Sequence, residues 1–130
     1  GLIEKYRMED AEYAVVAIGS CCGTIRTVVD EMREKGKKYG MLKLKCLRPF
    51  PEEEMRESLS KLNGITVLDR NISPGSHGAV YSEIKASLKN SKVRINNAIL
   101  GLGGKDITQD DIRNAFGISE KEDEAEKWLI

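Results

Sequence analysis

The segment that decides the fold reads Val67-Leu-Asp-Arg-Asn-Ile-Ser-Pro-Gly-Ser-His-Gly-Ala-Val-Tyr81. Its apolar beginning continues a run from residue 65 and predicts the end of a buried strand. Pro74 and Gly75 mark a tight turn, because proline fixes φ and glycine permits a positive φ. Apolar residues then recur at helical spacing, which predicts a helix that follows the turn directly.

The turn in this segment has two interpretations that the residues alone leave open. Ser73 and Ser76 can accept hydrogen bonds from the free N–H groups at the start of the following helix. A strand that enters such a turn before a helix N-terminus makes a natural anion site. The same arrangement is also how an ordinary α/β protein turns a corner.

The same order of strand, loop and helix recurs along the chain. Continuous or alternating apolar runs predict strands at 13–18, 40–46, 65–68 and 92–100, and apolar residues at helical spacing predict a helix after each one. This alternation predicts an α/β fold with three layers, a mostly parallel (mixed) sheet with helices on both faces. Thr108 and Asp111 have the spacing of a capping box for the last helix.

The predicted domain covers residues 13–118. Residues 1–12 are polar and are interpreted as a connector from a preceding domain. Residues 119–130 are interpreted as a charged C-terminal tail with an apolar tip. The charge run at 33–38 predicts a solvated helix end.

Four loops follow the carboxyl ends of the predicted strands, at 19–24, 47–51, 69–78 and 101–106. They are expected along one edge of the sheet, where open α/β sheets bind ligands or partners. The return loops at 36–39 and 63–64 carry no comparable signal. The phosphate-binding candidates on this edge are Ser20, Gly23, Thr24, Ser73, Gly75 and Ser76, and the interface candidates are Arg48, Phe50, Arg70 and His77.

No catalytic residue and no metal ligand is assigned from the sequence. The loops at 19–24 and 101–106 lack both the dinucleotide fingerprint and the Gly-Lys-Ser/Thr ending of a P-loop. Adjacent Cys21 and Cys22 do not have the spacing of a zinc or iron–sulfur site. The single histidine, His77, lies beside Ser76 in a turn, an arrangement that does not predict a catalytic triad.

Composition excludes several classes of function. The chain has 130 residues, with 21 Lys and Arg balanced by 21 Asp and Glu, so no basic excess indicates nucleic acid as a partner. The longest apolar run, at 14–18, is too short to span a membrane. No signal peptide is evident, and three cysteines without framework spacing indicate reduced thiols in the cytoplasm.

An ordered series of short motifs covers the chain from about residue 5 to residue 116. The series is Glu9-Asp-Ala-Glu12, Val16-Ala-Ile-Gly-Ser20, Gly23-Thr24, Leu47-Arg-Pro-Phe-Pro51, Val67-Leu-Asp-Arg70, Ser73-Pro-Gly-Ser76 and Gly101-Leu-Gly-Gly-Lys-Asp-Ile-Thr108. It resembles the C-terminal domain of the α subunit of pyruvate:ferredoxin (2-oxoacid:acceptor) oxidoreductases. The resemblance implies a transketolase C-terminal-like fold.

The resemblance also implies a function for the parent enzyme. Enzymes of this family oxidatively decarboxylate a 2-oxoacid to an acyl-CoA, pass electrons to ferredoxin and are typical of anaerobic metabolism. They use thiamine diphosphate, Mg, iron–sulfur clusters and CoA, which the resemblance places on other domains and subunits. This chain is then expected to bind no cofactor, to be inactive alone and to contribute to assembly with the other subunits.

Two alternatives remain open at this point. The chain could be a self-sufficient α/β domain that binds the phosphate of CoA or a nucleotide at residues 20–24 and 73–78. It could also be the equivalent domain of another thiamine enzyme, such as a transketolase-like E1 β subunit. A partner-dependent domain is expected to expose an apolar patch at the loop-bearing edge or around residues 128–130.

Overall fold

A computed structural model of the chain describes residues 2–18, 22–45, 49–70, 79–100, 107–121 and 126–129, with the side chains omitted for some residues next to the gaps. The central element is a six-stranded sheet in the order β1-β3-β2-β4-β5-β6. The strands are β1 (Ile3–Tyr6), β2 (Tyr13–Ile18), β3 (Tyr39–Leu44), β4 (Gly64–Arg70), β5 (Arg94–Leu100) and β6 (Glu126–Leu129). Only β1 pairs in the antiparallel direction, so the predicted mostly parallel, mixed sheet is confirmed.

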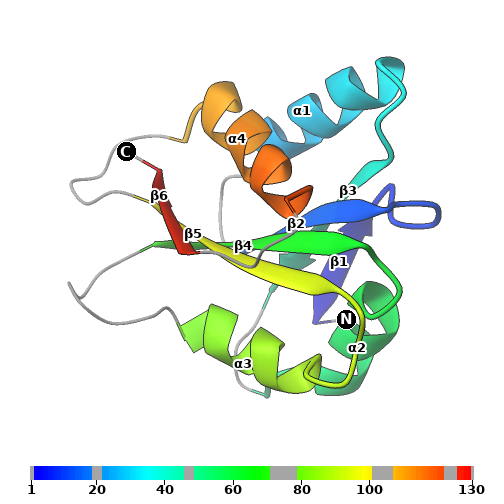
Figure 1. Ribbon diagram of the computed structural model, residues 1–130, viewed down its shortest axis with the longest axis vertical. Helices are drawn as coiled ribbons and strands as arrows, with labels where there is room; N and C mark the ends of the chain where they lie inside the picture. Colours follow the sequence, from blue (N-terminus) through cyan, green and yellow to red (C-terminus); the bar gives the residue numbers. More distant parts are fainter. Residues whose placement is uncertain are drawn as a thin grey trace.

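In the described part of the chain, four helices cover the two faces of the sheet (Figure 1). They are α1 (Cys22–Glu34), α2 (Glu52–Leu59), α3 (Ala79–Ser87) and α4 (Gln109–Ser119). Helices α1 and α4 lie on one face, and α2 and α3 lie on the other (Figure 1). The predicted three-layer α/β architecture is therefore confirmed.

Each face has its own hydrophobic core, and strand β2 contributes to both. Val16 contacts the core beneath α2 and α3, whereas Val15 belongs to the core beneath α1 and α4. Residues 14–17 are fully buried, as expected of a central parallel strand covered on both faces. In the second core, the rings of Tyr39 and Phe116 stack with centroids 4.1 Å apart.

Two strands were not predicted from the sequence. Strand β1 lies in the segment interpreted as a connector, where it pairs with β3 in the register Ile3↔Leu44. Strand β6 lies in the predicted tail and pairs with β5. Helix α4 also continues to Ser119, one residue beyond the predicted domain boundary. Whether residues 1–12 lead from a preceding domain stays a prediction.

Strand β1 and the turn after it are fastened to helix α1. The Tyr6 hydroxyl donates to Asp30 at 2.7 Å, and Arg26 pairs with Glu4. Arg33 donates to the Tyr39 carbonyl at 2.9 Å and to the Arg7 carbonyl at 2.7 Å. The first twelve residues thus contribute to the fold itself.

Residues 34–38 are exposed, as expected of a solvated helix end, but Arg33 is an exception to that interpretation of the run at 33–38. Its side chain is only 15% exposed and also pairs with Asp10 at 2.8 Å. The hydrogen bond from Arg33 lowers the pKa of the Asp10 carboxyl. Sequence spacing could not reveal this role, because the groups that Arg33 contacts come from the β1–β2 turn and the start of β3.

Candidate functional site

Parallel pairing brings four strand ends to one edge of the sheet. Strands β2, β3, β4 and β5 run in the same direction, and helices α1, α2, α3 and α4 follow them in turn. We call this edge the rim, meaning the carboxyl ends of these strands together with the N-terminal turns of the four helices. The described strand ends lie along one edge of the sheet, as expected from the sequence.

The first turn of α1 contains two of the predicted phosphate-binding residues, Gly23 and Thr24. Gly23 is exposed, and a Cβ atom built on it would meet no atom of the described structure within 4 Å. Its carbonyl accepts a 3.0 Å hydrogen bond from the Thr27 hydroxyl. No described neighbour therefore requires glycine at this position, and its φ is not in the positive region.

Phe50 and Pro51 lead into helix α2 at the neighbouring part of the rim. Phe50 is half-buried and packs against the core beneath α2 and α3, while Pro51 is buried. Glu52, Glu53 and Glu54 follow in the first turn, where the helix dipole favours negative charge. A shallow hollow lies between this turn and Leu2, so the corner combines partly exposed apolar surface with three carboxylates.

The N-terminus of α4 is closed by its own side chains. The Thr108 hydroxyl accepts from the Asp111 N–H at 3.1 Å, and the Asp111 carboxylate accepts from the Thr108 N–H at 3.0 Å. This reciprocal pair confirms the predicted capping box. The N–H groups that it occupies are not available to a ligand.

Helices α1 and α4 are joined by an ion pair. Arg113 binds Glu31 through two hydrogen bonds, and it also contacts Asp110 at 2.6 Å. The hydrogen bond from Arg113 lowers the pKa of the Glu31 carboxyl. We interpret this cluster as a structural link between the two helices, because all its partners belong to them.

For the other predicted site residues, either the side chain or the whole residue is not described by the structure. Arg70 ends strand β4, but the position of its side chain is not described. Cys22 begins α1, again without a described side chain. Ser20, Cys21, Arg48, Ser73, Gly75, Ser76 and His77 lie outside the described residues. Gly23, Thr24 and Phe50 are thus the predicted residues that can be placed, in two neighbouring parts of the rim.

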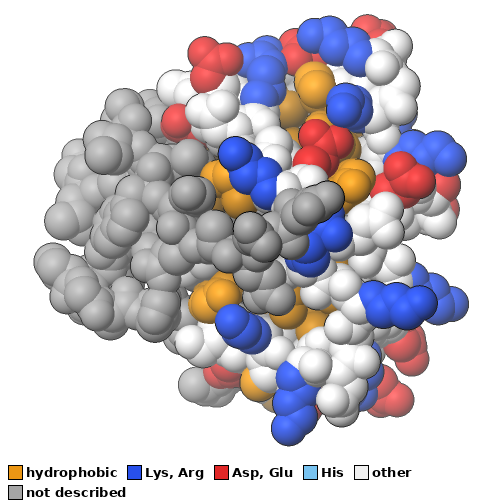
Figure 2. Space-filling model, viewed as in Figure 1, with side chains coloured by type: hydrophobic (Ala, Val, Ile, Leu, Met, Phe, Trp, Pro, Cys, Tyr) orange, Lys and Arg blue, Asp and Glu red, His pale blue; other side chains and the backbone are white. Residues whose placement is uncertain are grey.

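Among the described residues, no group of three or more His, Cys, Asp or Glu side chains could hold a metal ion. No described helix is long and apolar enough to cross a membrane. On the face shown in Figure 2, acidic and basic side chains are interspersed over the described surface.

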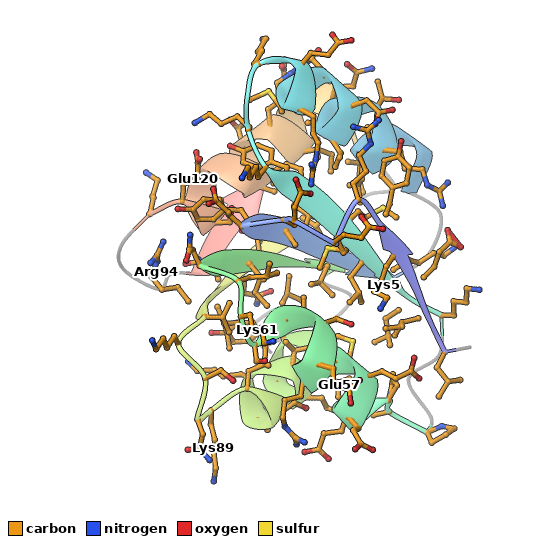
Figure 3. The ribbon with its side chains drawn as sticks, turned by 90° about the vertical axis from the view of Figure 1, so that its right-hand side faces the viewer. Lys5, Glu57, Lys61, Lys89, Arg94 and Glu120 are labelled. Carbon is orange, nitrogen blue, oxygen red and sulfur yellow. The ribbon has the colours of Figure 1, made fainter. Side chains whose placement is uncertain are left out.

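A hollow that the sequence did not predict lies at the opposite edge of the sheet, beside the turns that lead into β4 and β5. Four cationic side chains line it, from Arg56, Lys61, Lys92 and Arg94. In Figure 3, Arg94 lies near one side of the molecule, and Lys61 lies between Arg94 and Lys5 in the view. The available signal was the basic residues in the turns before β4 and β5, such as Lys61 and Lys92. The sequence alone does not show that these two turns lie side by side.

Comparison with known proteins identifies the family. The model of the family described as "Pyruvate:ferredoxin oxidoreductase core domain II" matches residues 11–112. The chain belongs to this family. It is also 46% identical to the pyruvate synthase subunit PorA of Methanocaldococcus jannaschii, over 99% of this chain and 33% of that protein. The chain therefore spans about a third of the length of the curated relative.

Solved structures agree with the core domain II fold. A 2-oxoglutarate:ferredoxin oxidoreductase from Magnetococcus marinus matches 86% of this chain and 18% of its own, with a TM-score of 0.68 and 21% identity. A split-gene transketolase matches 89% of this chain and 38% of its own, with a TM-score of 0.59 and 13% identity. The resemblance inferred from the ordered motifs and the transketolase-like fold are both confirmed.

Proposed function

We propose that this chain is the C-terminal structural and assembly domain of the α subunit of a 2-oxoacid:ferredoxin oxidoreductase. The observation that carries the proposal is the 46% identity to one third of a pyruvate synthase subunit, together with the core domain II match over residues 11–112. Pyruvate is the proposed 2-oxoacid. The parent enzyme decarboxylates it oxidatively, forms an acyl-CoA and transfers the electrons to ferredoxin.

The cofactors of the parent enzyme are assigned to its other domains and subunits. Thiamine diphosphate, Mg, iron–sulfur clusters and CoA supply the decarboxylation, the electron path and the acyl acceptor. Arg113 and Arg33 each make two or more hydrogen bonds, and the partners of these bonds all belong to this domain. The domain's own contribution is to hold its rim against the catalytic parts of the enzyme in the cytoplasm.

The corner formed by Leu2, Phe50 and the first turn of α2 supports an assembly role. Leu2 and Phe50 are both partly exposed beside a shallow hollow, so they leave apolar surface for a partner to cover. Glu52, Glu53 and Glu54 border this surface and favour a partner with basic side chains around an apolar contact. Residues 128–130, the other expected apolar patch, have no described side chains.

An activity assay tests the proposal. Pyruvate-dependent reduction of ferredoxin, with CoA and thiamine diphosphate present, is measured for this chain alone and for the complex purified with it under anaerobic conditions. We expect no activity from the chain alone and activity from the complex. Turnover by the isolated chain, or a purified complex without 2-oxoacid oxidation, would contradict the proposal.

A variant at the Leu2–Phe50 corner tests the assembly role separately. Replacement of Phe50 by Ser removes apolar contact area, and we expect less of the other subunits to co-purify. Lys5→Gln provides the control, because Lys5 is exposed on β1 and does not line this hollow. Circular dichroism establishes that both variants fold. If a folded Phe50→Ser variant recovers as much of the other subunits as the parent chain does, the Leu2–Phe50 corner is not part of the interface.

A further inference from the structure

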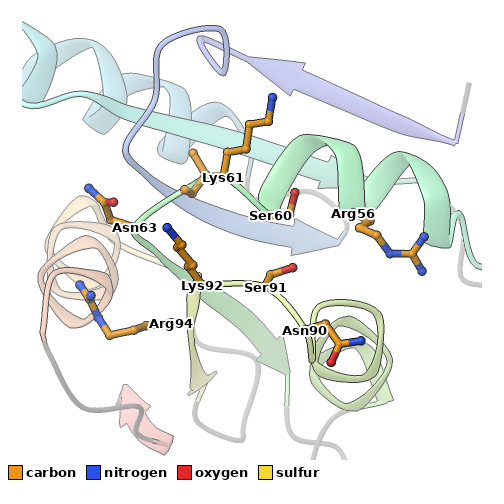
Figure 4. A pocket seen from close by; sticks show the side chains of 9 residues that line it. Arg56, Ser60, Lys61, Asn63, Asn90, Ser91, Lys92 and Arg94 are labelled. Atoms are coloured by element: carbon orange, nitrogen blue, oxygen red, sulfur yellow. The ribbon is translucent and has the colours of Figure 1, made fainter.

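A basic hollow opens at the edge of the sheet opposite the rim, with a volume of about 790 Å³ (Figure 4). It lies between the C-terminal ends of α2 and α3 and the turns that lead from them into β4 and β5. Register explains why these turns meet, since Gly64 on β4 pairs with Arg94 on β5. The Arg94 N–H donates to the Asn63 carbonyl at 3.2 Å, which joins the two turns directly.

The charge of the hollow differs from that of the whole chain, which has a net charge of zero. Its lining contains four cations and, among the residues that the structure describes, no carboxylate. Lys61 and Lys92 are exposed, and neither amine has an ion pair with any described residue. Their like charges are therefore left without compensation in this part of the chain.

The two arginines have fixed positions. Arg56 donates to the Ser87 carbonyl at 3.3 Å and pairs with Glu52 at 2.9 Å. The Nε of Arg94 donates to the Lys121 carbonyl at 2.7 Å, which leaves the terminal nitrogens of Arg94 as further donors. These contacts hold both guanidinium groups at the hollow without neutralising the charge of Arg94.

A simpler interpretation assigns the lysines to capping the helix ends, because cations are favoured at helix C-termini. The backbone already closes these ends. The Ser60 N–H donates to the Arg56 carbonyl at 3.0 Å, and the Ser91 N–H donates to the Leu88 carbonyl at 2.9 Å. No described hydrogen bond joins the Lys61 or Lys92 amine to these carbonyls. The amines therefore do not act as caps.

The helix dipoles nevertheless oppose an anion here. Each of α2 and α3 presents its carbonyl end to this edge, equivalent to about half a negative charge. Arg56 is paired with Glu52, but the three charges of Lys61, Lys92 and Arg94, which have no ion pair with any described residue, exceed that contribution. The hollow therefore keeps a net attraction for anions, weaker than a site at helix N-termini with the same side chains would have.

The neutral groups around the hollow define the kind of anion. Ser60, Ser91, Asn63 and Asn90 add hydroxyl and amide donors, and none of the described residues that line the hollow has an aromatic ring for a base to stack on. Arginine, lysine and small neutral donors together suit phosphate oxygens. The volume is within the range of small-molecule sites, about 300–1,000 Å³, and exceeds what a single phosphate fills.

We propose that this hollow binds an oligophosphate group, two or more linked phosphates carried by a small molecule. The side chain of Lys92 extends towards the turn that carries Lys61 and Asn63 (Figure 4). A bound diphosphate would contact Lys92 and Arg94, and the exposed side chain of Lys61, which Figure 4 shows directed away from Lys92, would turn towards it on binding. The site is separate from the rim, and the proposal does not depend on the function proposed for the rim.

Titration of the ¹⁵N-labelled chain with inorganic pyrophosphate at low ionic strength tests the site. We expect saturable shifts confined to the amides of residues 60–63 and 90–94, and affinity at least tenfold higher than for orthophosphate. The Lys61→Gln/Lys92→Gln variant should lose at least tenfold in pyrophosphate affinity. The Lys5→Gln/Lys45→Gln variant changes the net charge equally at two exposed lysines outside the hollow and should bind as the parent chain does.

Three results would overturn the proposal. The first is an absence of saturable binding, or shifts spread over all basic residues of the chain. The second is equal loss of affinity in the two double variants, which would indicate a general charge effect. The third is tighter binding of hexaglutamate than of pyrophosphate at the same amides, which would assign the hollow to an acidic segment of a protein instead.

Discussion

Arg113 on α4 and Glu31 on α1 form a two-pronged ion pair, with Nε–Oε1 and Nη2–Oε2 distances of 2.8 and 2.9 Å. Both side chains are 33% exposed, so water weakens the pair without removing it. The pair joins the two helices that cover one face of the sheet. Its geometry leads to a prediction about stability in acid.

Stability is expected to fall in acid partly through Glu31. Arg113 lowers the pKa of this carboxyl in the folded state, so the folded chain binds the proton less readily than the unfolded chain. The stabilisation is present above the ordinary glutamate pKa, about 4.3, and is lost as pH falls below it. Urea unfolding between pH 3 and pH 7 should show a smaller acid loss for Glu31→Gln. An unchanged slope would show that the pair makes no contribution.

Thr66 tests a buried hydrogen bond between the sheet and α4. Its hydroxyl donates to the Ala115 carbonyl at 2.7 Å, and the side chain is fully buried. Thr66→Val keeps the shape but removes the donor, so we expect a loss of about 1–2 kcal/mol in the free energy of unfolding. Thr66→Ser retains the hydroxyl and serves as the comparison. A Val variant as stable as the parent would show that the bond contributes nothing net.

Replacement by alanine is expected to affect stability in opposite ways at Gly64 and at Gly23. A Cβ on Gly64 would collide with the backbone carbonyl of Ser119, whereas one on Gly23 would meet open space. We expect Gly64→Ala to cost about 1–3 kcal/mol through overpacking. Gly23→Ala should be neutral or stabilising by up to about 1 kcal/mol, because alanine is the better helix former. Thermal unfolding measures both, and equal effects would contradict the packing described for Gly64.

Tyr39 is expected to resist ionisation. Burial, with a smaller contribution from a hydrogen bond to Glu120, raises the pKa of its phenol well above the ordinary value. The folded state therefore holds this proton more tightly than the unfolded state does. The resulting stabilisation is complete below about pH 10 and is lost as pH rises further.

Absorbance at 295 nm follows the phenols during an alkaline titration. The parent chain should show a late component that appears only with unfolding, and that component should be missing in Tyr39→Phe. Absence of this late component from the parent chain would contradict the buried position of Tyr39.

The sequence predicted the parts of the fold that depend on local pattern. Residues 13–18 form a continuous apolar run, and that run is a buried central strand. The capping box at Thr108 was also readable, because its two partners lie three residues apart. Strand β1 was not, since a four-residue polar strand is defined by its pairing with β3 and has little pattern of its own.

The candidate sites were only partly predictable for the same reason. The rim followed from strand order alone, because parallel strands place their carboxyl ends together. The basic hollow required the β4–β5 register, which brings Lys61 and Lys92 together from segments 31 positions apart. Arg33 likewise gained its partners from tertiary structure, which a charge pattern does not encode.

Anaerobic capture of partners tests the central claim most directly. The chain is used as bait in a lysate of its source, and the recovered proteins are identified by mass spectrometry, with the Phe50→Ser variant alongside. We expect recovery of thiamine-binding and iron–sulfur subunits of one oxidoreductase, reduced for the variant. A folded bait that recovers none of these subunits would contradict the proposed assembly role.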